Sequence, residues 1–183
     1  MKKVILAALA LVPALAFANP GAYVQAQAGV NWIDSGTSAV SSFTGFVGGV
    51  GIGYLWGDST INYGLEADSL WYPNSTTSYQ GVNLKVNGYN ISLLGVLKYT
   101  DCATGFVAFA KAGAAYVNQD VTASGLLTGT GTGNQVAPEG DLGVGYMFNP
   151  NWELDLTGNY VYTDNTNTGN NANLMLGLAY HFA

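Results

Sequence analysis

The feature that most constrains this chain is an alternation of apolar and small or polar residues that recurs from residue 22 to the C-terminus. In the closing stretch NLMLGLAYHFA, the apolar series is Leu174, Leu176, Leu178, Tyr180 and Phe182. Successive side chains on a strand point to opposite faces, so the stretch predicts a strand with one continuous apolar face. Such a face has to be covered, either by a protein core or by lipid.

The same period of two describes eight segments, and no stretch after the N-terminus has a convincing helical period. The segments are AYVQAQAGVNW (22–32), TGFVGGVGIGYLW (44–56), YGLEADSLW (63–71), YNISLLGVLKY (89–99), FVAFAKAGAAY (106–116), PEGDLGVGYMF (138–148), WELDLTGNYVY (152–162) and NLMLGLAYHFA (173–183).

The connections between these segments alternate in length. Those after the second, fourth and sixth segments are the short turns GDSTIN, TDCATG and NPN. The others are longer, polar and rich in Gly, Ser, Thr and Asn, and the longest is expected at about 118–135, while Tyr72 and Tyr79 are expected in another. Short turns at one end and long loops at the other are the layout of an outer-membrane barrel. The sequence therefore predicts an all-β fold, a transmembrane eight-stranded antiparallel up-and-down β-barrel.

Aromatic residues on the apolar faces favour lipid over a protein core. Tyr89 and Tyr99, which bracket the fourth segment, are ten positions apart, or about 33 Å along a strand. A strand tilt of about 40° reduces this length to about 25 Å, the height of an apolar band between two aromatic girdles. A soluble secreted β-protein, with these aromatics in its core, is the alternative. The predicted girdles comprise Trp32, Tyr54, Tyr63, Trp71, Tyr89, Tyr99, Phe106, Tyr116, Tyr146, Phe148, Trp152, Tyr162, Tyr180 and Phe182.

Composition excludes several classes of protein. Charged residues make up only 9% of the chain, against about 25% in soluble domains. The net charge is −6 and there is no Arg, so a nucleic-acid backbone would not be neutralised. Beyond the N-terminus, no apolar run approaches the roughly 18 residues that a spanning helix needs.

The first 18 residues, MKKVILAALALVPALAFA, are typical of a secretory signal peptide. Two lysines precede an apolar stretch, and Ala16 and Ala18 form a small-x-small cleavage pattern. We expect cleavage after Ala18, which leaves one barrel domain over residues 19–183; an N-terminal membrane anchor is the alternative. The single cysteine, Cys102, excludes an internal disulfide framework and is either an inert thiol or a route to a linked dimer.

Charged residues lie on the mixed, Gly-rich face of the predicted strands, which faces the barrel interior. Isolated ions are costly in a narrow interior, so carboxylates should pair with lysines, bind water or take up protons. Two interpretations stay open: a polar plug that fills the barrel, or a gate whose switching ion pairs open a small cation-preferring path. The predicted interior charge network comprises Glu66, Asp68, Lys98, Lys111, Glu139, Asp141, Glu153 and Asp155.

No catalytic, cofactor or metal site is predicted. The one histidine, His181, is expected inside the barrel near the periplasmic end, which is too little for a metal cluster or an acid–base site. The stretch VGGVGIG lacks the following helix that dinucleotide binding requires, and its glycines provide interior clearance. Asp34, Asp120 and Asp164 stand alone in separate expected loops and give no calcium site.

The segments TGFVGGVGIGY, YGLEADSLWY, AFAKAGAAY and GDLGVGYMFNPNWELDLTGNY, with the aromatic C-terminus, resemble the outer-membrane β-barrel family of OmpA-type and opacity-type proteins. The resemblance implies a monomeric barrel in the outer membrane of a Gram-negative bacterium. It also implies periplasmic chaperones and the barrel-assembly machinery as partners, with Gly177, Tyr180 and Phe182 in the assembly signal.

Members of that family serve membrane integrity, adhesion, host contact, or narrow and gated pores. We therefore expect a structural or surface-interaction role, with a possible host or surface ligand bound by the long loops. A small or gated cation-preferring pore is the alternative.

Overall fold

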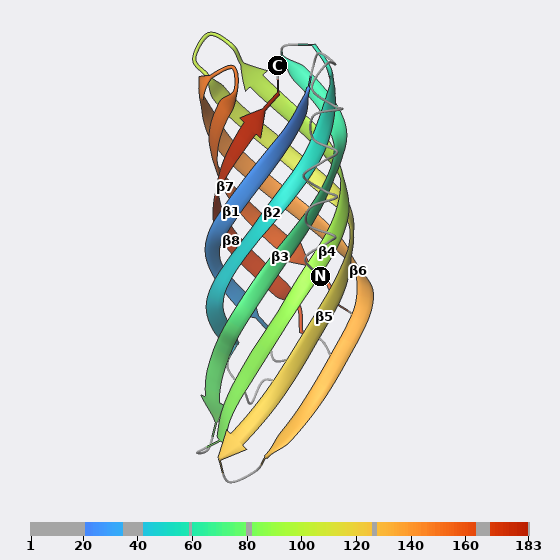
Figure 1. Ribbon diagram of the computed structural model, residues 1–183, viewed down its shortest axis with the longest axis vertical. Helices are drawn as coiled ribbons and strands as arrows, with labels where there is room; N and C mark the ends of the chain where they lie inside the picture. The colour runs from blue at the N-terminus through green and yellow to red at the C-terminus, as the bar shows by residue number, and fades with distance from the viewer. Residues whose placement is uncertain are drawn as a thin grey trace.

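Eight antiparallel strands close into one barrel in this computed structural model, which describes residues 21–34, 42–58, 60–79, 82–125, 128–163 and 169–182 (Figure 1). Neighbours in the sequence pair throughout, and β1 pairs with β8 to close the barrel. The predicted fold class is confirmed. No helix in the described part of the chain is long and apolar enough to cross a membrane. The strands are β1 (Ala22–Ile33), β2 (Phe43–Gly57), β3 (Ile61–Tyr79), β4 (Val82–Asp101), β5 (Phe106–Gly125), β6 (Gly129–Asn149), β7 (Trp152–Val161) and β8 (Asn171–His181).

Three short turns lie at the end of the barrel where β8 finishes (Figure 1). Asp58 and Asn149 each accept hydrogen bonds from the backbone N–H groups two and three positions later, at 2.8–3.1 Å. Asp101, the last residue of β4, accepts a hydrogen bond from the hydroxyl of Thr104 at 2.6 Å. This bond lowers the pKa of Asp101, because it favours the ionised carboxylate. Side-chain oxygens therefore organise each predicted short turn.

Strands β3 to β6 project beyond the other four at the opposite end (Figure 1). They have 19 to 21 residues, whereas β7 and β8 have 10 and 11. The predicted loop at 118–135 is therefore wrong, because pairing of β5 with β6 continues to Ala123↔Gly129. Tyr72 and Asp120, both expected in loops, belong to β3 and β5. The side chain of Tyr79 and the whole of Asp164 lie outside the described residues.

The missed strand segments reverse the alternation on which the prediction relied. On β5, Gln119 is buried and Val121 is half-buried, while Asp120 on the outer face is exposed. Inside the lipid band the outer face of a strand is apolar, but beyond the band the outer face meets water and becomes polar. A sequence pattern based on outward apolar residues therefore predicts that each strand ends at the edge of the lipid, although these strands continue beyond it.

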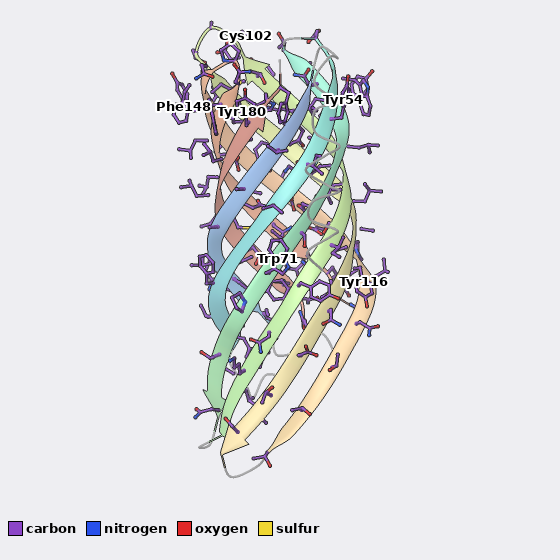
Figure 2. The ribbon with its side chains drawn as sticks, in the orientation of Figure 1. Tyr54, Trp71, Cys102, Tyr116, Phe148 and Tyr180 are labelled. Atoms are coloured by element: carbon purple, nitrogen blue, oxygen red, sulfur yellow. The ribbon has the colours of Figure 1, made fainter. Side chains whose placement is uncertain are left out.

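The predicted girdle aromatics all lie on the outer face, and none of them is buried. Tyr54, Phe148 and Tyr180 lie near the short-turn end, which also carries Cys102, whereas Trp71 and Tyr116 lie further toward the projecting strands (Figure 2). Aliphatic side chains between the two levels are strongly exposed, such as Leu93 at 61%. Three outward aromatics were not in the predicted set: Phe46, Trp56 and Tyr160.

Candidate functional site in the barrel interior

The predicted interior charges come together inside the barrel. They lie on the inward positions of β3 to β7, and their relative exposures range from 1% to 7%. Hydrogen bonds divide them into three groups, which are described in turn from the short-turn end.

The first group contains Lys98, Glu153 and His181. The Lys98 amine donates to a carboxylate oxygen of Glu153, and Nε2 of His181 lies 3.0 Å from the same oxygen. The imidazole ring also packs against the Tyr23 ring, with centroids 5.3 Å apart. Lys98 and His181 form part of the lining of a bowl of about 550 Å³ at the short-turn mouth. The histidine therefore lies inward near this end, in an ion-pair group.

The second group is centred on Lys111. Its Nζ lies 2.6 Å from Oε1 of Glu66 and 3.4 Å from Oε1 of Gln25. The hydroxyl of Tyr23 donates to the other Glu66 oxygen, and Nε2 of Gln25 donates to Asp155 at 2.8 Å. These side chains also line a cavity of about 20 Å³, room for about one water molecule. The group therefore draws on four strands, β1, β3, β5 and β7, and Glu66 and Gln25 bind its one buried lysine.

Glycines opposite the large interior side chains provide the room that the sequence predicted. A Cβ on Gly53 would lie 2.4 Å from the ring of Tyr23, and one on Gly143 would lie 2.1 Å from the ring of Phe109. Neither distance is possible for a real side chain, so each ring occupies space that only glycine leaves open.

The third group contains Asp68, Glu139 and Asp141. One carboxylate oxygen from each lies within 4.8 Å of the others. Neutral donors hold two of them: Ser92 donates to Glu139, and Nδ2 of Asn159 donates to Asp141 at 2.7 Å. Oδ1 of Asp68 is buried without a hydrogen-bond partner. Because the two interior lysines donate to Glu66 and Glu153, this group is built from carboxylates and neutral polar groups.

A largely apolar layer fills the interior beyond the third group, toward the projecting strands. Buried asparagines lie among its apolar side chains, such as Asn90, which accepts a hydrogen bond from the hydroxyl of Tyr72. The sequence predicted a polar interior here and missed this layer, including the fully buried Tyr72. A signal was available in the consecutive apolar pairs Phe46–Val47 and Leu70–Trp71, where both faces of a strand are apolar. The layer consists of two buried clusters that draw on all eight strands: Ile33, Phe43, Val47, Leu70, Tyr72, Val86 and Met175, and Ala115, Val117, Ala137 and Val161.

The sequence matches the family described as the outer membrane protein beta-barrel domain over residues 4–182. The chain belongs to this family. The protein is thus an outer-membrane β-barrel, embedded in the lipid of a Gram-negative outer membrane. Residues 1–18, the predicted signal peptide, lie outside the described residues, and cleavage after Ala18 stays a prediction.

Solved structures of other outer-membrane barrels share the fold. Neisserial surface protein A superposes with a TM-score of 0.64 at 20% identity, and Ail of Yersinia pestis with 0.60 at 12%; both alignments cover 88% of this chain and 97% of the other. The outer membrane enzyme PagL gives 0.50 at 13%, covering 86% and 97%. At these identities the likeness shows the fold alone. A comparison with curated protein sequences finds no match.

The predicted assembly-signal residues lie on both faces of β8. Gly177 faces inward, where a Cβ would lie 2.5 Å from a carboxylate oxygen of Asp155. Tyr180 and Phe182 face outward with ring centroids 5.0 Å apart. Gly177 therefore leaves room for the Asp155 carboxylate inside the barrel. Recognition of these residues by the assembly machinery stays a prediction.

Proposed function

We propose that this barrel is a closed, non-catalytic outer-membrane protein that binds partners at the cell surface through its projecting strands. In this proposal the short turns face the periplasm and the ends of β3 to β6 rise above the lipid. The observation that supports this proposal is the extension of β3 to β6 beyond the other four strands (Figure 1).

The projecting part of β6 has a free backbone edge. β7 pairs with β6 only over Glu139 to Asn149, so among the described residues 129–137 pair on one side, with β5. The carbonyl of Pro138 accepts the N–H of Tyr162 from the β7 side. Backbone groups of alternate residues point the same way, so those of Thr130, Thr132 and Asn134 point to the free edge. An extended segment of another protein can add to such an edge as a further strand.

The closed interior supports a surface role over conduction. Eleven apolar side chains from all eight strands are buried in two clusters between the charged groups and the projecting end. Below them, buried lysines are held by Glu66 and Glu153. A pore would require both the apolar layer and these ion pairs to move.

The surroundings of His181 support a non-catalytic role, although one structurally similar barrel, PagL, is an enzyme. The ring contacts described for His181 are to Glu153, Lys98 and Tyr23. In acyl-transfer and hydrolytic sites that use a histidine as the base, a hydroxyl or thiol nucleophile is hydrogen-bonded to the imidazole. Instead, His181 here extends an ion pair.

The chemistry of the projecting sheet favours a protein ligand over a polyanion. Ail has been solved in complex with a heparin analogue, sucrose octasulfate. In this chain the net charge is −6, and the mature sequence has three lysines, of which Lys98 and Lys111 are buried. Lys85 alone of these faces outward, so a sulfated sugar would find no basic patch.

Adhesion of Gram-negative cells that express the chain to epithelial monolayers tests the proposal. The edge variant Thr130→Pro/Asn134→Pro removes two N–H groups at the free edge, and Thr130→Ala/Asn134→Ala is the matched control that keeps them. We expect adhesion above that of cells without the chain, loss of adhesion in the proline variant, and retention in the alanine variant.

Single-channel recording in planar bilayers tests the alternative function, a pore. Reproducible openings that change with Lys111→Met, in a protein that gives no adhesion above background, would replace the proposal with the gated cation-preferring pore.

A further inference from the structure

Three carboxylates from distant parts of the sequence meet inside the barrel. Asp68 comes from β3, and Glu139 and Asp141 come from β6, yet one oxygen of each lies within 4.8 Å of the others. Calcium binds oxygen ligands at about 2.3–2.6 Å, so ligands on opposite sides of one ion are about 4.6–5.2 Å apart. The three oxygens are thus close enough to surround a single ion.

One oxygen of Asp68 lacks hydrogen bonds of the kind that hold the other two carboxylates. The relative exposure of Asp68 is 4%, and its Oδ1 is buried with no hydrogen-bond partner. One of its carboxylate oxygens lies within 4.8 Å of those of Glu139 and Asp141. Burying a polar atom without a partner is unfavourable, and burying a charged one is more so. A buried carboxylate with an unsatisfied oxygen, beside two other carboxylates, is a position for a cation.

Neither interior lysine forms an ion pair with these three carboxylates. Lys111 lies opposite Asp141 in the β5–β6 register, but its Nζ is 2.6 Å from Oε1 of Glu66. Lys98 is bound to Glu153 in the group at the mouth. Six interior carboxylates thus share two lysines and one histidine. Four of the six are outside the ion pairs, and three of these four, Asp68, Glu139 and Asp141, lie together.

We propose that Asp68, Glu139 and Asp141 bind one hard divalent cation of the calcium class inside the barrel. All the donors are carboxylate oxygens, the ligand type that such ions prefer over nitrogen and sulfur. Ser92 and Asn159 act as positioning residues, because their hydrogen bonds orient Glu139 and Asp141. The ion cross-links β3 to β6 through the lumen and offsets the repulsion among the three carboxylates. This site goes beyond the proposed surface function and does not depend on it.

Metal content of the refolded protein tests the site with Ca²⁺ as the probe. The mature chain is refolded into detergent micelles with CaCl₂ or with EDTA, free metal is removed, and bound calcium is measured by mass spectrometry. We expect about one ion per barrel after refolding with CaCl₂, and a higher unfolding temperature than after refolding with EDTA. Folding is verified in each sample by the gel shift between boiled and unboiled protein.

Two substitutions separate this site from general interior charge. Asp68→Asn removes the unpartnered oxygen's charge and should lower bound calcium at least tenfold. Asp155→Asn, the matched control, changes an equally buried carboxylate that Gln25 and Thr157 already hydrogen-bond, and should retain the ion. Asp141→Asn is the second variant should Asp68→Asn fail to fold.

Two results would overturn the proposal. One is folded wild-type barrel with no calcium above the EDTA-treated level, which would mean that protons neutralise the three carboxylates. The other is equal loss of calcium in Asp68→Asn and Asp155→Asn, which would assign binding to the interior charge as a whole.

Discussion

Lys111 illustrates how single residues are held in this barrel. Its amine is buried between Glu66 and Gln25, and Nζ also lies over the ring of Phe109, 5.1 Å from the centroid. Lys85, by contrast, is exposed on the outer face of β4 in the projecting sheet. The two lysines differ in burial and in partner, so the same substitution should have very different effects.

Lys111→Met should lower the free energy of unfolding by about 3–5 kcal/mol, because it leaves Glu66 as a buried, uncompensated charge. Lys85→Met should change it by no more than about 0.5 kcal/mol, as an exposed substitution without a buried partner. Urea titration of the barrel in micelles, followed by tryptophan fluorescence, measures both. Equal effects of the two substitutions would contradict the ion pair seen for Lys111.

At the scale of elements, the long strands β3 to β6 are the main departure from the predicted arrangement. On β5, the inward side chains of Val117, Gln119 and Val121 continue in the same alternation from the barrel into the projecting sheet and are buried or half-buried. The outward side chains change from apolar to polar along the same length. Strand structure follows the backbone pairing and not the polarity of one face, so it extends past the point where the apolar pattern stops.

A pair of cysteines tests this extension. Asn118 and Asn134 are directly opposite in the β5–β6 register, and opposed residues have Cα atoms about 4.5–5.5 Å apart, which a disulfide can bridge. In a Cys102→Ser background, Asn118→Cys/Asn134→Cys should form a disulfide on oxidation, read as a mobility change that reducing agent reverses.

The off-register control is Asn118→Cys/Thr130→Cys. Thr130 is four residues from Asn134, or about 13 Å along the strand, so this pair should stay reduced in folded protein. Similar cross-linking of both pairs would indicate a flexible loop over 118–135, as first expected from the sequence.

The molecule as a whole has a barrel that faces lipid and a sheet of β3 to β6 that extends from it into water. Leu93 and Ser124 both face outward, but Leu93 lies between the aromatic levels of Tyr89 and Tyr99, while Ser124 lies near the tip of β5. The family match establishes an outer-membrane barrel, and the aromatics indicate where its lipid boundaries lie.

Leu93→Arg should destabilise the barrel in phospholipid vesicles by about 2–4 kcal/mol, since it puts a charge near the bilayer midplane. Ser124→Arg should have an effect of about 0–1 kcal/mol, because its side chain reaches water. Reversible urea unfolding in vesicles gives both values. A neutral Leu93→Arg would place the lipid band elsewhere on the strand.

Strand number, the short turns and the two faces of each strand in the lipid band were determined by the sequence alone. These properties are local, because the direction of a side chain follows from its parity along the strand and a turn from a few residues such as Asp58 and Asn149. For the same reason, the eight interior charges could be selected by residue number before any pairing was known.

Which of those charges meet depends on the tertiary structure. Closure of the sheet and the stagger of its strands bring Asp68 of β3 beside Glu139 and Asp141 of β6, and give Lys98 to Glu153 and Lys111 to Glu66. The apolar layer around Tyr72 was also decided there, because an inward apolar residue shows its role only when neighbours from other strands surround it. Alternation specifies the face of each strand, while contacts across the lumen depend on how the strands close into a barrel.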